Sequence, residues 1–240
     1  MVRKVWQICV YAGMDDYHVV MDQKAVGREL LAQVLEEVGV KEQEWFGLQY
    51  KDDDNFWHWL VHDKKVLSQR VSEKNDPIVM FLKVVIFPPQ PSLLDDPVAQ
   101  SIVYLQVRVA IESEEILCSS KESSVLKELA EADKVEEYLT KAEMMSEYGW
   151  WHFLMTRPQD TTPARVSVGL TGLILTVDNR KFDFPFSEVD EVWASGKKLM
   201  IKYVCKNIST TTFMGPNNNF TKDFQFLANA HHHHYLHSAI

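Results

Sequence analysis

Hydrophobic and polar residues alternate along residues 5–10 and again along residues 17–21. A period of two residues is typical of β-strands that bury one face. Residues 12–15 separate the two runs and include Gly13, so they predict a turn. The beginning of the chain is therefore expected to form a β-hairpin.

A helical pattern follows the hairpin. The apolar residues of 26–38 share one helical face, and Gly39 stands where helices commonly end. Residues 46–50 and 56–60 predict short strands, and residues 78–87 predict a central strand because they are apolar on both faces. Two strands, a helix and three further strands are the element order of a ubiquitin-like roll.

Prolines concentrated between residues 88 and 97 mark a boundary after this roll. Apolar residues at helical spacing then predict one helix in 98–109 and a second in 125–142, with a polar break at 118–124 between them. The middle section has only about 60 residues, which is small for an independent core. We expect it to pack on its neighbours.

Short apolar runs divided by Gly, Pro, Asn and Asp predominate from residue 148 onward, which predicts a small barrel or sandwich. The predicted strands are 150–155, 165–170, 173–177, 182–184, 189–194, 198–203 and 210–213. A helical pattern in 220–235 predicts a final helix, capped by Asn219 or Thr221. Strands followed by one amphipathic helix are typical of a barrel of the pleckstrin-homology or phosphotyrosine-binding kind, closed by its helix. The predicted fold class is thus α+β.

The composition of the chain restricts the classes of function that it can have. The 240 residues carry a formal net charge of −9, which disfavours nucleic acid as a partner. No apolar run reaches the roughly 18 residues of a membrane span, and no signal peptide is evident. Three scattered cysteines suit a reducing cytosol and show no metal-ligand spacing. We find no nucleophile with a base, no glycine-rich phosphate loop and no paired carboxylates in a motif, so we expect neither catalysis nor a cofactor.

Short motifs that recur in one order run along nearly the whole chain. They are WFGLQY at 45–50, WL at 59–60, DKKV at 63–66, YLQV at 104–107, ILC at 116–118, YG at 148–149, FPFSE at 184–188 and KKLMIK at 197–202. Together they resemble the FERM domains of the ezrin–radixin–moesin–merlin family. The resemblance implies a binding module that links membrane lipids and receptor tails to cortical actin, located in the cytoplasm at the inner face of the plasma membrane.

The resemblance also implies three lobes and one departure from the family pattern. The expected lobes are 1–87, ubiquitin-like; 88–146, helical; and 147–240, a barrel of the pleckstrin-homology or phosphotyrosine-binding kind. Roughly half of the family's second, helical lobe is absent here. The trefoil arrangement of the three lobes is therefore left open for the middle lobe.

The first site implied by the resemblance would bind phosphoinositide headgroups in the cleft between the first and third lobes. The candidate residues are Lys64, Lys65, Lys197, Lys198 and Lys222. Lysines that converge on a headgroup act as point charges on its phosphates. Val61 and Asp63 replace a lysine and an asparagine of the family pattern, so we expect weakened binding; solvated surface lysines are the alternative.

The second implied site is a groove between a third-lobe strand and the last helix, where receptor tails would add as an extra strand. Its candidate residues are Val192, Leu199, Ile201, Gln225, Asn229 and His232. Barrel core is the alternative for Leu199 and Ile201. Asn229 replaces a methionine of the family pattern, which makes that wall more polar.

The run of histidines at 231–234 with His237 invites a metal-site interpretation, since His233 and His237 are one helical turn apart. No carboxylate or cysteine lies at fixed spacing, so we expect structural or surface histidines and no metal. Two alternatives to a membrane tether are a merlin-like signalling scaffold that acts through protein partners, and a non-functional or engineered variant.

Overall fold

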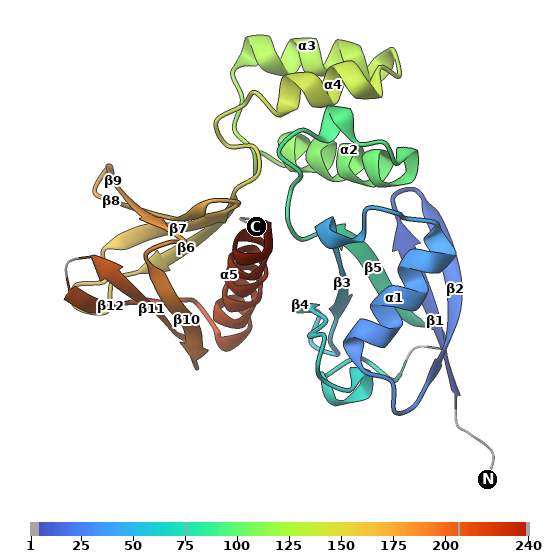
Figure 1. Cartoon of the computed structure of the whole chain (residues 1–240), viewed down its shortest axis with the longest axis horizontal. Helices are drawn as coiled ribbons and strands as arrows, with labels where there is room; N and C mark the ends of the chain where they lie inside the picture. Colours follow the sequence, from blue (N-terminus) through green and yellow to red (C-terminus); the bar gives the residue numbers. More distant parts are fainter. Residues whose placement is uncertain (1–4, 75, 206, 239–240) are drawn as a thin grey trace. The chain divides into compact units, whose positions relative to one another are not determined.

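The computed structural model describes residues 5–74, 76–205 and 207–238. Contacts group the chain into two compact units, Met1–Tyr148 and Gly149–Ile240 (Figure 1). The three lobe boundaries drawn from the sequence stay predictions. Within the described residues, no helix combines the length and the apolar character needed to cross a bilayer.

The first unit contains a five-stranded sheet in the order β2-β1-β5-β3-β4. Its strands are β1 (Val5–Ala12), β2 (Asp15–Asp22), β3 (Phe46–Lys51), β4 (Trp57–Trp59) and β5 (Ile78–Val84). β1 and β2 form the predicted antiparallel hairpin, and the central β5 runs parallel to β1. β5 ends earlier than predicted, at Val84, and beyond it the backbone N–H groups of Val85 and Ile86 both donate to the carbonyl of Trp45.

One face of this sheet is covered by α1 (Gly27–Val38). The buried side chains of the helix recur at the spacing that the sequence predicted. Gly39 follows with φ of 83°, a left-handed conformation that favours glycine, and its N–H donates to the carbonyl of Leu35. The predicted helix end is therefore confirmed. Short 3₁₀ helices lie at Gln43–Trp45, Val66–Ser68 and Pro91–Leu93.

Three helices complete the first unit: α2 (Pro97–Glu112), α3 (Ser120–Glu131) and α4 (Val135–Ala142). The prediction of one helix over 125–142 is wrong, because Asp133 has φ of 54° and breaks the segment. The polar break predicted at 118–124 is wrong as well. Ser119 caps α3, with its hydroxyl accepting from the N–H of Glu122 while the Glu122 carboxylate accepts from the N–H of Ser119.

Asp96 joins α2 to the roll. Its carboxylate caps α2 by accepting from the N–H groups of Val98 and Ala99, and it also accepts from Lys41 N–H at 2.6 Å and, more weakly, from Glu42 N–H. Burial raises the pKa of this carboxyl, but these backbone donors outweigh burial and hold the pKa below its ordinary value. The middle section was expected to pack on its neighbours, and this contact is how it meets the roll.

The second unit contains seven strands in the order β10-β11-β12-β6-β7-β8-β9. They are β6 (Trp151–Thr156), β7 (Pro163–Gly169), β8 (Gly172–Val177), β9 (Arg180–Pro185), β10 (Val189–Ser195), β11 (Lys198–Cys205) and β12 (Asn207–Met214). Each coincides with one of the seven predicted runs. The last element is the predicted helix, α5 (Asn218–Ser238).

α5 packs on the strands through aromatic side chains. Phe153 of β6 lies edge-on to Phe220 and Phe224, with ring centroids 5.0 and 5.1 Å apart. The cap predicted at Asn219 or Thr221 is wrong: the Asn217 side chain accepts from the N–H of Phe220 at 2.9 Å. The predicted α+β class is confirmed, as a roll with a helix across its sheet, a short helical section, and strands closed by a final helix.

Candidate functional site

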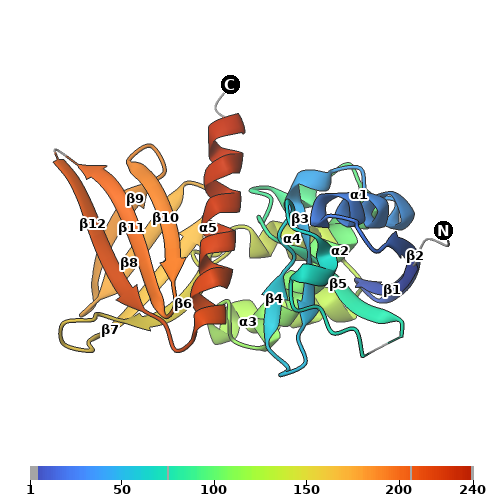
Figure 2. The ribbon, with the colours of Figure 1, turned by 90° about the horizontal axis from the view of Figure 1, so that it is seen from below.

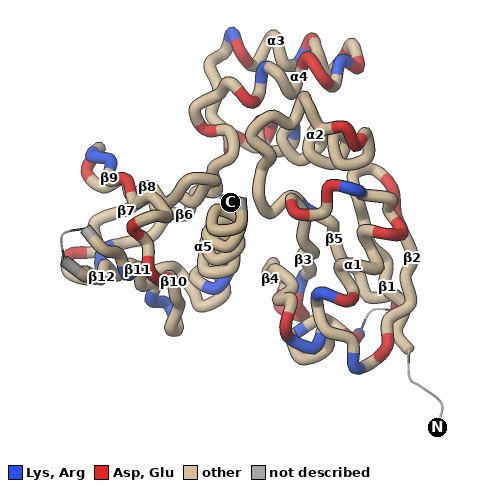
Figure 3. The backbone as a smooth tube through the Cα atoms, in the orientation of Figure 1, with Lys and Arg blue, Asp and Glu red and all other residues tan. Residues whose placement is uncertain are grey.

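Three of the predicted headgroup lysines lie at one end of the second unit. Lys197 is in the turn between β10 and β11, Lys198 begins β11, and Lys222 is near the start of α5. The Thr221 hydroxyl donates to the carbonyl of Gly196 at 2.7 Å, which fastens the start of α5 to this turn. All three lysines are exposed. Figure 3 shows basic segments where β10 meets β11 and at the start of α5. We call Lys197, Lys198 and Lys222 the α5 lysine cluster.

Lys64 and Lys65 are exposed in the loop that follows β4 of the first unit. Backbone hydrogen bonds fasten this loop to the start of α1, among them Gly27 N–H to the Lys64 carbonyl at 2.9 Å. A side chain at Gly27 would place a Cβ 2.4 Å from the carbonyl oxygen of Val61. Glycine therefore allows the close approach that holds the two lysines in position.

Asp63, which replaces an uncharged residue of the family pattern, is paired rather than isolated. Arg28 Nη1 lies 2.7 Å from Asp63 Oδ1, and both side chains are largely exposed, at 67 % and 79 %. The pair offsets part of the negative charge expected to repel phosphate. Sequence analysis missed Arg28, because the two partners are 35 residues apart and no local pattern joins them.

The predicted peptide groove lies along β10, which is an edge strand, and α5 runs beside it (Figure 2). The side chain of Gln225 accepts from the backbone N–H of Ala194 at 3.1 Å. This N–H points away from β11 and so belongs to the open edge of the sheet, where an added strand would pair. A peptide that adds here has to share or displace the Gln225 oxygen.

The other groove residues differ in exposure. Val192, Leu199 and Ile201 are at most 3 % exposed, so they lie in the core beneath the groove rather than on its surface. Asn229 is exposed on α5. His232 is half-buried and stacks on Phe186, with ring centroids 5.0 Å apart. Burial lowers its pKa, although the nearby carboxylate of Asp190 works in the opposite direction.

His231 is fully buried, on the helical face that the sequence pattern assigns to it together with Phe220, Phe224 and Leu227. Its Nδ1 lies 2.8 Å from the carbonyl of Leu227, so the ring donates a hydrogen bond there. Its Nε2 is buried with no hydrogen-bond partner, and burial lowers the pKa of the ring to about 4. The helical spacing of 220, 224, 227 and 231 was the available signal, since it places His231 on the apolar face.

Known proteins with related sequences and folds indicate which family this chain resembles. The family model of the FERM N-terminal domain matches residues 14–72. "Moesin/ezrin/radixin homolog 1" of Culex quinquefasciatus and its namesake of Aedes aegypti are each 25 % identical over 276 aligned positions, covering 90 % of this chain. The resemblance to FERM domains of the ezrin–radixin–moesin–merlin family is confirmed.

Solved structures agree with this fold. The FERM and C-terminal domain complex of Drosophila Merlin superposes with a TM-score of 0.84 at 22 % identity, covering 98 % of this chain and 97 % of that one. The MyTH4-FERM MF2 domain of Dictyostelium discoideum Myosin VII superposes with a TM-score of 0.63 at 12 % identity, covering 95 % of this chain and 61 % of that one.

The chain spans about half the length of the curated relatives it matches, 48 % and 47 %. The alignments run over 276 positions, more than the 240 residues of this chain, so the relatives contain segments with no counterpart here. FERM domains of this family generally belong to membrane–cytoskeleton linkers, which are structural adaptors rather than enzymes.

Proposed function

We propose that this FERM module provides the membrane side of a membrane–cytoskeleton link at the cytoplasmic face of the plasma membrane. It binds phosphoinositide headgroups through its exposed lysines and holds a receptor-tail peptide at the edge of β10. Its link to actin is indirect. The observation that carries the proposal is the α5 lysine cluster on a chain whose net charge is −9.

The charge balance supports a local site rather than general attraction. A net negative chain is repelled by an anionic leaflet, but at about 0.15 M salt this repulsion is screened beyond about 8 Å. Lysines close to the lipid surface each contribute about 1 kcal/mol of attraction. Positive charge is concentrated locally at two places, the α5 lysine cluster and the pair Lys64 and Lys65.

Vesicle sedimentation tests the lipid part. The protein is mixed with phosphatidylcholine vesicles that contain or lack a few per cent of a phosphatidylinositol bisphosphate. We expect sedimentation with the phosphoinositide vesicles alone, decreasing as salt is raised. Equal sedimentation with both vesicle types would contradict headgroup binding.

The open edge of β10 supports the peptide part. Strand addition uses backbone hydrogen bonds for affinity and side-chain contacts for selectivity. Here the edge N–H of Ala194 donates to the Gln225 side chain rather than to another strand, and Asn229 provides the exposed wall. Fluorescence anisotropy with a labelled adhesion-receptor tail peptide measures this binding directly. Peptide binding without vesicle binding would favour the merlin-like scaffold over a membrane tether.

A further inference from the structure

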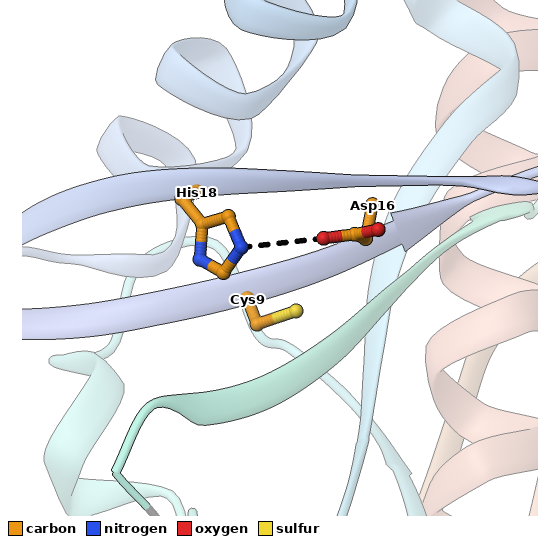
Figure 4. A group of neighbouring side chains, drawn as sticks. All are labelled: Cys9, Asp16 and His18. Carbon is orange, nitrogen blue, oxygen red and sulfur yellow. Dashed lines mark ion pairs between the residues drawn. The ribbon is translucent and has the colours of Figure 1, made fainter.

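The β1–β2 hairpin brings together three different metal-binding side chains. Cys9 of β1 pairs directly with His18 of β2, and Asp16 precedes His18 by two residues, so all three side chains project from one face of the hairpin. Figure 4 shows the three together. One ligand atom from each lies within 4.8 Å of the others, the one such group of three in residues 5–74, 76–205 and 207–238.

The spacing of these atoms suits a single ion. His18 Nε2 and Asp16 Oδ2 are 3.2 Å apart, close to the roughly 3.3 Å expected between two ligands of one tetrahedral zinc ion. A thiolate ligand would lie about 3.5 Å from each. Small side-chain rotations of Cys9 therefore complete three corners of a tetrahedron, without a change in the backbone register of the hairpin.

The three side chains differ in burial, with the sulfur beneath the surface and the imidazole and carboxylate exposed to solvent. Cys9 is only 6 % exposed, whereas the side chains of His18 and Asp16 are 61 % and 56 % exposed. An ion can thus enter from solvent past the imidazole and carboxylate and meet the sulfur beneath them. The fourth position faces solvent, where a water molecule completes the coordination.

We propose that Cys9, Asp16 and His18 form a zinc site. Sulfur and imidazole nitrogen are ligands that Zn²⁺ accepts and that Mg²⁺ and Ca²⁺ avoid, and one carboxylate oxygen is compatible with zinc. The site is independent of the proposed lipid and peptide binding. Its position on the β1–β2 hairpin would cross-link the edge strand β2 to its neighbour.

Titration of the full chain with Zn²⁺ and with Co²⁺ tests the site. We expect one ion per chain at the hairpin, and a thiolate-to-cobalt charge-transfer absorption in the Co²⁺ form. The test background is Cys118→Ser with Cys205→Ser, so that Cys9 is the one remaining thiol. Since the loss of outer hydrogen-bond partners of metal ligands already costs 10–100-fold in affinity, loss of a ligand should cost about 100-fold or more.

Matched variants separate this site from other zinc ligands. His18→Gln and Asp16→Asn change exposed side chains, so folding should be retained while binding is lost; Cys9→Ser should abolish the absorption. Asp15→Asn is the matched control and should bind zinc like the parent.

The histidines of α5 are the competing zinc ligands: His233 and His237 stack with ring centroids 4.0 Å apart. Binding that survives His18→Gln and Asp16→Asn, or that is lost only in His233→Gln with His237→Gln, would overturn the proposal, as would the absence of zinc binding or of the absorption.

Discussion

Arg28 and Asp63 form an ion pair of 2.7 Å immediately beside Lys64. The pair links the start of α1 to the loop that carries Lys64 and Lys65, two of the proposed headgroup lysines. Exposed ion pairs contribute only about 0–1 kcal/mol to stability. The main effect of the Arg28–Asp63 pair is therefore on the charge beside Lys64.

Asp63→Asn should therefore strengthen binding to phosphoinositide vesicles. The change removes a negative charge beside the lysines and leaves the Arg28 guanidinium available for phosphate. One added unit of positive charge near a lipid surface is worth about 1 kcal/mol, or roughly fivefold in affinity. Glu112→Gln is the control, because it releases Arg108 from a similar exposed pair of 2.8 Å on α2. Unchanged affinity for Asp63→Asn in vesicle sedimentation would mean that this loop does not meet the lipid.

Asn229→Met should tighten binding of a receptor-tail peptide. The thioether would supply an apolar wall beside the open edge of β10, and its burial is worth about 1 kcal/mol, a roughly fivefold gain measured by fluorescence anisotropy. Thr210→Met places the same side chain on the exposed surface of β12 and should have no effect. If both variants bind the peptide as the parent does, the peptide lies elsewhere.

The segment of α3 and α4 should be the least stable part of the first unit. Leu126 is the one buried side chain of α3, whereas α2 is fixed to the roll through Asp96. Native-state hydrogen exchange should show amides of residues 119–141 opening at free energies well below those of α1 and β5. Equal protection in all these elements would show that the short helical section unfolds only with the whole unit.

Stability of the second unit should fall in acid because of His231. Its pKa is about 4 in the folded protein and about 6.5 when unfolded, so the unfolded state binds more protons between these values. The free energy of unfolding should thus decrease from pH 6.5 toward pH 4, by up to about 3 kcal/mol. His231→Phe should flatten this pH dependence in denaturant titrations, and His233→Phe, at an exposed position, should not. Parallel curves for the parent and His231→Phe would contradict the assignment.

Periodic patterns predicted most of the fold. Alternation predicted the hairpin, and short apolar runs divided by Gly, Pro, Asn and Asp predicted the seven strands of the second unit. The break at Asp133 was missed, since neither glycine nor proline marks that turn. The cap of α3 did have a signal, Ser119 followed three residues later by Glu122, which is the pattern of a capping box.

The candidate sites were harder to predict from the sequence than the helices and strands. Lysines can be counted in a sequence, but the bond from Thr221 to Gly196 that gathers the α5 lysine cluster depends on tertiary packing. Likewise, Gln225 was expected in the groove, whereas its contact with the edge N–H of Ala194 follows only from how α5 lies beside β10. Side chains that act through distant partners have no periodic signature.

We propose that local lysines bind this protein to phosphoinositide membranes, and charge reversal in the α5 lysine cluster tests this binding. Vesicle affinity is measured at about 0.15 M salt for the parent, Lys222→Glu and Lys181→Glu. The two variants change net charge equally, but Lys181 lies exposed on β9, the strand at the opposite edge of the sheet from β10. Lys222→Glu should weaken binding by about 2 kcal/mol, or roughly 30-fold, and Lys181→Glu should bind like the parent. Equal affinities for Lys222→Glu and the parent, or equal losses in both variants, would contradict the account.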